Sequence, residues 1–163
     1  MKRRNFLQLS SVAGLGLTLP MSGFLNACTS HPEHSLEFKN LISSLLKDWS
    51  DGMLKVQINN PSNIDEHGAL GCPSCSHIHG RCMDAVYPFL YMADKTGDQK
   101  YVKGAKLVML WAENNVSQPN GAWTVIKNPK SWKGITIFGA IALAEALHYH
   151  GHVLDDVTRK AWT

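Results

Sequence analysis

A four-residue turn between two amphipathic stretches is the feature of this sequence that most constrains its fold. In Lys95-Thr96-Gly97-Asp98, Gly97 suits the end of one helix and Asp98 suits the N-cap of the next. Apolar residues recur at steps of three and four on both sides of the turn. They are Cys82, Val86, Phe89, Leu90 and Ala93 before it, and Tyr101, Val102, Ala105, Val108 and Trp111 after it. This pattern predicts an antiparallel helical hairpin, with a kink at Pro88.

Beyond the hairpin the domain is predicted to contain further helices, one long loop, a turn at residues 117–121 and a short strand or extended loop at residues 122–126. The apolar spacing favours a helix over residues 36–49, ended by Asp51-Gly52, and another over about 133–150. Residues 55–78 carry Asn, Gly and Pro without helical periodicity, which is typical of a loop. A last helix is expected to begin at Asp155-Asp156 and to be still running at the final residue. The chain is therefore interpreted as an all-α protein and as the N-terminal part of a longer one.

The first 27 residues have the pattern of an export signal. A basic start with Arg3-Arg4 precedes an apolar stretch that is too short and too rich in Gly to be a good membrane span. The segment resembles a twin-arginine signal. Residues 25–28, Leu-Asn-Ala-Cys, resemble a lipobox, in which Cys28 is acylated and anchors the protein to a membrane surface. We expect residues 28–34 to form a tether, residues 35–163 to form the domain, and the protein to reside in the bacterial cell envelope, in the periplasm or at the outer membrane.

The charge of the remaining chain argues against a nucleic-acid partner. The formal net charge is +3, but the signal holds three basic residues and no acidic ones. Removing those three from 16 basic residues leaves 13, equal to the 13 acidic residues. A neutral domain without a run of Lys or Arg lacks the basic surface that binds phosphate backbones.

Three thiols and two imidazoles lie within eleven residues at the end of the predicted loop. A C-x₂-C pair presents two thiolates to one point, and zinc takes four such ligands in a tetrahedral site. The predicted zinc ligands are Cys72, Cys75, His77 and Cys82. Two alternatives stay open, because spacing does not determine ligand geometry. Two of the cysteines form a disulfide in an oxidising envelope, or all three thiols are small buried residues.

Residues 79–101 and 131–147 resemble hairpins of the α/α-toroid carbohydrate-active proteins. The motifs are His79-Gly-Arg-Cys-Met-Asp-Ala-Val-Tyr-Pro88, Thr96-Gly-Asp-x-x-Tyr101, and the later Ser131-Trp-Lys-Gly-Ile-Thr136. This group includes heparinase-II/III-like and other polysaccharide lyases, together with several glycoside hydrolases. The resemblance implies antiparallel helical hairpins that form part of an (α/α) toroid, and a polysaccharide or oligosaccharide as partner.

Four residues at the start of the hairpin suit lyase chemistry on a uronic-acid glycan. Arg81 suits neutralisation of the substrate carboxylate, and His79 or Tyr87 suits removal of the adjacent proton. Asp84 lies one helical turn from Tyr87, so the two can share a face. The predicted catalytic set is therefore His79, Arg81, Asp84 and Tyr87. The alternative is a purely structural role: Arg81 and Asp84 form a salt bridge, and Tyr87 packs in the core.

A later segment offers candidate substrate contacts. Trp123 and Trp132 present flat faces that suit sugar rings, and Lys133 suits hydroxyls or carboxylates. The alternative is that both tryptophans pack in the core. The alternating His148, His150 and His152 are interpreted as a solvated helix end, because an i, i+2 spacing on a helix does not converge on one metal ion.

The sequence thus predicts an exported polysaccharide-degrading enzyme, a lyase acting on uronic-acid-containing glycans. One alternative is a non-catalytic glycan-binding or scaffold lipoprotein with a zinc or disulfide staple. Another is a glycoside hydrolase of the same fold, although its paired carboxylates are not evident here. Apart from zinc, no cofactor is expected.

Overall fold

The computed structural model describes residues 32–72, 74 and 77–163 of the chain. The chain divides into two units, residues 1–40 and 41–163, and the fold below is that of the second unit. Its described residues form helices and no strand, with two isolated β-bridges. The elements are α2 (Pro32–Val56), of which residues 41–56 belong to this unit, η2 (Gly80–Ala85), α3 (Val86–Thr96), α4 (Gln99–Asn115), α5 (Ile135–His150), η3 (Gly151–Val153) and α6 (Asp156–Trp162). None of these helices is long and apolar enough to cross a membrane.

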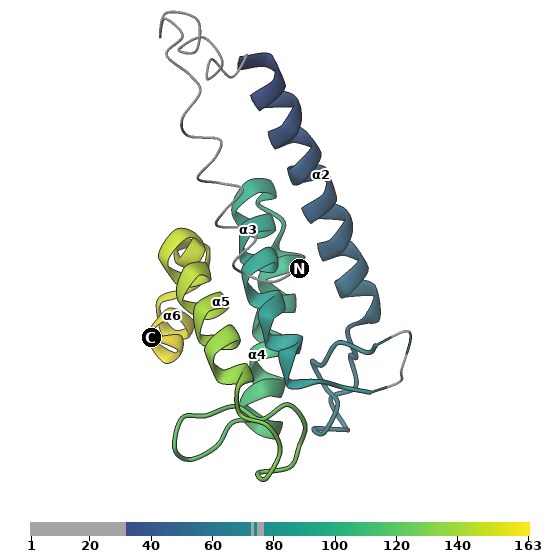
Figure 1. Ribbon diagram of the computed structural model, residues 1–163, viewed down its shortest axis with the longest axis vertical. Coiled ribbons are helices and arrows are strands. Elements are labelled where there is room, and N and C mark those ends of the chain that lie inside the picture. Colours follow the sequence, from purple (N-terminus) through teal and green to yellow (C-terminus); the bar gives the residue numbers. More distant parts are fainter. Residues whose placement is uncertain (1–31, 73, 75–76) are drawn as a thin grey trace, which may run out of the picture. The chain divides into compact units, whose positions relative to one another are not determined.

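The predicted hairpin is confirmed as α3 and α4, which lie side by side in Figure 1. Gly97 adopts the left-handed conformation, with φ of 71°, and its N–H donates to the carbonyl of Ala93 over 2.8 Å. The Asp98 side chain accepts from the N–H of Lys100 at the start of α4. Both helix ends are therefore satisfied within the turn itself, as the sequence predicts.

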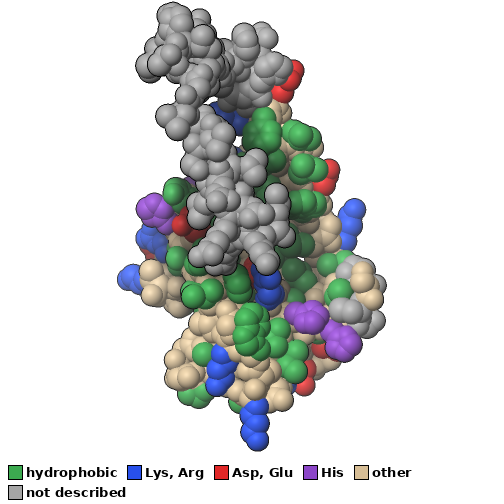
Figure 2. All heavy atoms as spheres, in the orientation of Figure 1, with side chains coloured by type: hydrophobic (Ala, Val, Ile, Leu, Met, Phe, Trp, Pro, Cys, Tyr) green, Lys and Arg blue, Asp and Glu red, His purple; other side chains and the backbone are tan. Residues whose placement is uncertain are grey.

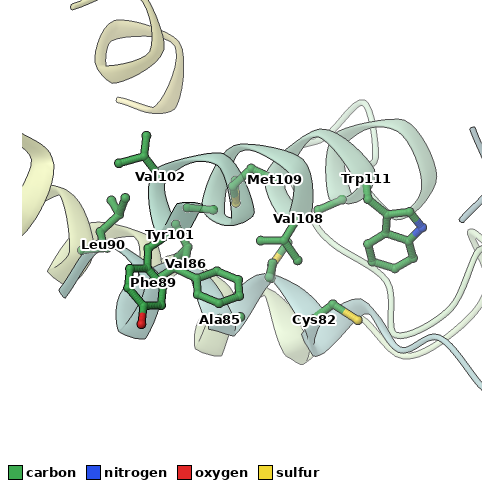
Figure 3. Packing of buried hydrophobic residues seen from close by; sticks show 14 of the residues in the cluster. Cys82, Ala85, Val86, Phe89, Leu90, Tyr101, Val102, Val108, Met109 and Trp111 are labelled. Carbon is green, nitrogen blue, oxygen red and sulfur yellow. The ribbon is translucent and has the colours of Figure 1, made fainter. Parts of the chain in front are cut away.

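The core lies between the facing sides of these two helices. Figure 3 shows Val86, Phe89 and Leu90 of α3 directed toward Tyr101 and Val108 of α4. All five side chains are almost completely buried. Helix α5 packs against α3 and η2, so the hairpin is the platform on which the third helix rests.

Two local predictions about helix ends are wrong. Helix α2 does not end at Asp51-Gly52 but continues to Val56. The Asp51 carboxylate accepts hydrogen bonds from the Lys47 ammonium and from the Tyr101 hydroxyl of α4, so it serves as an anchor between helices.

Pro88 does not kink a single long helix either. The chain forms the 3₁₀ segment η2 first, and α3 begins anew at Val86. Pro88 is then the third residue of α3, where the absent N–H would have had no intrahelical partner.

The apolar residues of α2 form the predicted helix but remain largely uncovered. Leu41 is 56% exposed and Trp49 is 65% exposed, whereas Leu54 packs against the core cluster. Figure 2 shows hydrophobic side chains in green at the surface over α2. Among the described residues of α2, Leu46, Met53 and Leu54 pack against the hydrophobic core.

The predicted long loop is confirmed between α2 and η2, and side-chain hydrogen bonds hold it against α4. The Trp111 indole N–H donates to the carbonyl of Asp65 over 2.9 Å, and the Asn115 amide donates to that of Ile64 over 3.0 Å. Gly68 has φ of 94°, and a Cβ there would lie 2.1 Å from the carbonyl oxygen of Leu107. These contacts hold residues 64–68 of the loop against α4.

Phe89→Ala tests the packing of the hairpin. Phe89 is fully buried, so its truncation leaves a cavity and is expected to cost about 3–5 kcal/mol in the free energy of unfolding. Leu110→Ala is the control: Leu110 is 48% exposed on α4, and its loss should change stability by less than about 1 kcal/mol. Urea unfolding followed by circular dichroism measures both values. Equal effects of the two substitutions would contradict the packing described here.

Candidate functional site

The junction of η2 and α3 brings together three of the four predicted catalytic residues. Its position is fixed by Gly80, whose N–H donates to the carbonyl of Val125 over 2.7 Å. A Cβ on Gly80 would lie only 2.3 Å from the Thr124 carbonyl oxygen, so a larger residue would push the junction away. The backbone at Gly80 is thus held against Thr124 and Val125 of the segment that precedes α5.

Arg81 lies at the centre of this junction. Its Nε donates to Oδ2 of Asp84 over 2.8 Å, and its guanidinium carbon lies 4.9 Å from the centroid of the Phe138 ring on α5. The Arg81 side chain is still 57% exposed. Since the Nε and one face of the group are occupied, the guanidinium has a defined orientation, while its terminal nitrogens are accessible to a ligand.

Two cavities flank the junction and share Arg81, Asp84, Tyr87 and Pro88 in their walls. The α2 cavity has a volume of about 710 Å³. The α5 cavity is smaller, at about 370 Å³. The α2 cavity is completed mainly by α2 residues, namely Leu46, Asp48, Trp49, Gly52, Met53 and Val56. The α5 cavity is completed by Phe138, Ile141, Ala142 and Glu145.

The two cavities have the size and composition of ligand sites, which are mostly apolar with a few placed polar groups. Among the described residues, no donor reaches Oδ1 of Asp84, although this oxygen is buried. A buried acceptor without a partner is costly. Asp84 can therefore accept a hydrogen bond from a ligand hydroxyl or from a further part of the protein.

The ring of Tyr87 packs against the imidazole of His150. The Tyr87 and His150 rings meet edge to face with centroids 5.7 Å apart, and Tyr91 meets the same imidazole at 5.4 Å. His150 is buried, and its Nδ1 lies 3.1 Å from Oδ2 of Asp94. Because a carboxylate only accepts, Nδ1–H is the donor of this bond.

This contact corrects the interpretation of His150 as part of a solvated helix end, whereas His148 and His152 are exposed as expected. Oδ2 of Asp94 is hydrogen-bonded to His150, and Oδ1 of Asp94 lies 2.8 Å from Nε2 of His152. Desolvation opposes ionisation of Asp94, but hydrogen bonds from the two histidines and Lys95 hold its pKa below the ordinary value. Helix α5 ends at His150 and η3 follows, so a helical spacing rule does not apply across them.

His79 is not part of either cavity. It is exposed, and its ring centroid lies 6.3 Å from that of His77 on the same loop. The predicted catalytic set is therefore separated by the fold into Arg81, Asp84 and Tyr87 at the junction and His79 on the loop before it.

The predicted zinc ligands do not form a cluster within the part of the chain that the structure describes. Cys75 lies outside the described residues, so zinc at this loop stays a prediction. Cys82 is buried, its thiol donates to the carbonyl of Leu70 over 3.5 Å, and burial raises the pKa of this thiol. For Cys82 alone, the burial and the hydrogen bond are those of a small buried residue, whereas Cys72 is only partly buried.

The predicted substrate contacts are placed apart. Trp123 is half-buried against the core, and it lines a cavity of about 480 Å³ beside α5 and α6 that includes neither Trp132 nor Lys133. Trp132 is 59% exposed, with its indole against Gly134, where a Cβ would come within 2.3 Å of the ring. Trp132 and Lys133 are thus available at the surface, whereas Trp123 corresponds largely to the core-packing alternative.

Two comparisons with known proteins both relate this chain to ulvan lyases. A family model described as the ulvan lyase N-terminal domain matches residues 46–163. The broad-specificity ulvan lyase of Formosa agariphila is 79% identical over 163 residues, which is 100% of this chain and 26% of that protein. The chain therefore spans about a quarter of the length of this relative. No solved structure matches.

Thiol alkylation tests the state of Cys82. Because the thiol is buried and its pKa is raised, we expect iodoacetamide to modify Cys82 only after unfolding, with or without a chelator. Peptide mass spectrometry of the treated protein measures the modification of each cysteine separately. Rapid labelling of Cys82 after chelator treatment of the folded protein would instead identify it as a metal ligand.

Proposed function

This chain belongs to the ulvan lyase N-terminal domain family, and we propose that the full-length protein is a polysaccharide lyase that cleaves ulvan, a glycan containing uronic acid. The observation that carries the proposal is the 79% identity to a broad-specificity ulvan lyase, which extends over the entire chain. The name of that relative favours elimination over the hydrolytic alternative. The predicted (α/α) toroid is part of the same proposal, with α3, α4 and α5 as part of its helices.

The reaction class defines what the site must do. In β-elimination a base removes the proton next to the uronate carboxylate, the bond to the glycosidic oxygen breaks, and a carbon–carbon double bond forms. The departing oxygen takes up a proton. Negative charge accumulates on the carboxylate during proton removal, so a cation paired with that group stabilises the transition state.

Arg81 is suited to this role by its geometry. Asp84 holds the Nε and the Phe138 ring covers one face, so the planar guanidinium keeps one orientation while 57% of the side chain stays exposed. Such a plane binds a carboxylate through two parallel hydrogen bonds. Tyr87 lies within the walls of the same cavities and is the proposed proton-transferring group at this junction. His150 holds the Tyr87 ring in place.

Arg81→Ala in the full-length protein tests this assignment. We expect kcat/KM on ulvan to fall by roughly 10²–10³-fold, the usual effect of removing one transition-state donor. The absorbance of the unsaturated uronate product measures the rate. The matched control is Arg159→Ala, which removes an equally exposed arginine from another i, i+3 pair, with Asp156 at 2.8 Å, and should leave the rate unchanged.

Assays of ulvan cleavage and ulvan binding by the wild-type full-length protein distinguish the lyase from the glycan-binding alternative. Cleavage of ulvan with formation of unsaturated ends supports the lyase, and an unchanged rate in Arg81→Ala would remove Arg81 from the mechanism. Retained ulvan binding without cleavage would favour the glycan-binding lipoprotein.

We also propose that the protein is exported by the twin-arginine route and anchored through acylated Cys28. The signal and Cys28 lie outside the described residues, so the support comes from the sequence motifs alone. Cys28→Ala should move the protein from the membrane fraction to the soluble fraction of the envelope, because acyl-chain burial would be lost. Immunoblots of the two fractions measure this, and continued membrane association of the variant would contradict lipid anchoring.

A further inference from the structure

Helix α5 is apolar on nearly every side. Its sixteen residues, Ile135–His150, include one acidic residue, Glu145, and no Lys or Arg. One side of the helix is covered by η2 and the hairpin: Ile135 and Ala146 are almost completely buried, and a Cβ on Gly139 would lie 2.3 Å from Sδ of Met83 in η2. A helix with this composition is normally buried all round.

The opposite side of α5 is uncovered. Ile137 is 65% exposed, Ile141 is 58% exposed, and Phe138 beside them is 44% exposed. Ala140 and Ala144 are also exposed. The spacing of three and four residues from Ile137 to Ile141 and Ala144 places them in one strip along the helix. We call Ile137, Ala140, Ile141 and Ala144 the outer α5 face.

The chemistry of this face suits a protein segment better than a sugar. Its four side chains carry no hydrogen-bonding group, whereas glycan sites need polar groups for hydroxyls. An apolar strip with alanines between isoleucines allows another helix to approach closely. Exposed apolar surfaces of this kind mark interaction sites.

We propose that the outer α5 face packs against the polypeptide that follows Thr163 in the full-length protein. The length of that polypeptide supports this occupant: the matched part is 26% of the relative, which leaves 74% outside it, and the family model itself describes an N-terminal domain. Phe138 and Ile141 also line the α5 cavity. Because Ile141 belongs to both the face and the cavity, a polypeptide packed on the outer α5 face also borders the candidate site. This proposal does not depend on lyase activity.

Photo-crosslinking identifies the occupant. Benzoylphenylalanine replaces Ile141 in full-length protein, prepared as an equal mixture of ¹⁴N- and ¹⁵N-labelled molecules and irradiated. We expect crosslinks to peptides beyond residue 163 that carry the same isotope label. The control places the same group at Lys103, an exposed position on α4, and should give no such crosslinks.

Three other results would overturn the proposal. Crosslinks between differently labelled molecules would identify a second copy as the occupant. Crosslinks to added ulvan, or to lipid vesicles of phosphatidylethanolamine and phosphatidylglycerol, would identify a glycan or a membrane. The absence of any crosslink from position 141 would show that the face is solvent-exposed.

Ile141→Ser provides an independent measurement in the full-length protein. If the face is covered by the following polypeptide, this change should lower the melting temperature by roughly 2 °C or more, since an isoleucine is lost from a packed interface. Lys103→Ser is the control and should leave the melting temperature unchanged. Equal melting temperatures for the wild type and Ile141→Ser would count against the proposal, whether or not ulvan is cleaved.

Discussion

The apolar contact between α3 and α4 is the interaction on which the other parts of this domain depend. Phe89 and Tyr101 are buried at its centre, and the residues that place the surrounding segments project from the same two helices. The Tyr101 hydroxyl donates to Asp51 of α2 over 2.8 Å, and the Trp111 indole holds the loop before η2. Hydrogen bonds from Lys47, Tyr101 and Lys100 keep the pKa of Asp51 well below its usual range. One packed interface therefore positions α2, the loop and α5.

The candidate site combines a rigid backbone with polar groups that are only partly satisfied. Gly80 fixes the backbone, and Asp84 and Phe138 orient the guanidinium of Arg81. The other carboxylate oxygen of Asp84 is buried, and the described residues offer it no donor. Buried polar groups in folded proteins are normally paired. This oxygen is therefore the polar atom of the candidate site whose hydrogen-bonding capacity is unused among the described residues.

Sequence reasoning succeeded where the physical cause is local. Gly97 can adopt positive φ and Asp98 can accept from a nearby N–H whatever surrounds them, so the turn was predictable from four residues. The sequence-based predictions are wrong where a contact with a residue far away in the chain determines the local structure. Asp51-Gly52 has the composition of a helix end, but lysines and Tyr101 hold Asp51 inside α2. Likewise, the solvated environment expected for His150 is wrong, because Asp94 of α3 contacts its imidazole and the ring is buried.

By itself, then, the sequence determined the helical class, the hairpin with its caps and the loop before η2, because periodicity and capping act over a few residues. The pairing of Arg81 with Asp84 was also foreseeable, since they are three residues apart. Only the tertiary structure decided that Phe138 covers Arg81, that Asp94 binds His150, and that His79 lies outside the cavities. Those contacts join elements far apart in the chain. Their geometry depends on how α5 packs against the hairpin, which no local pattern encodes.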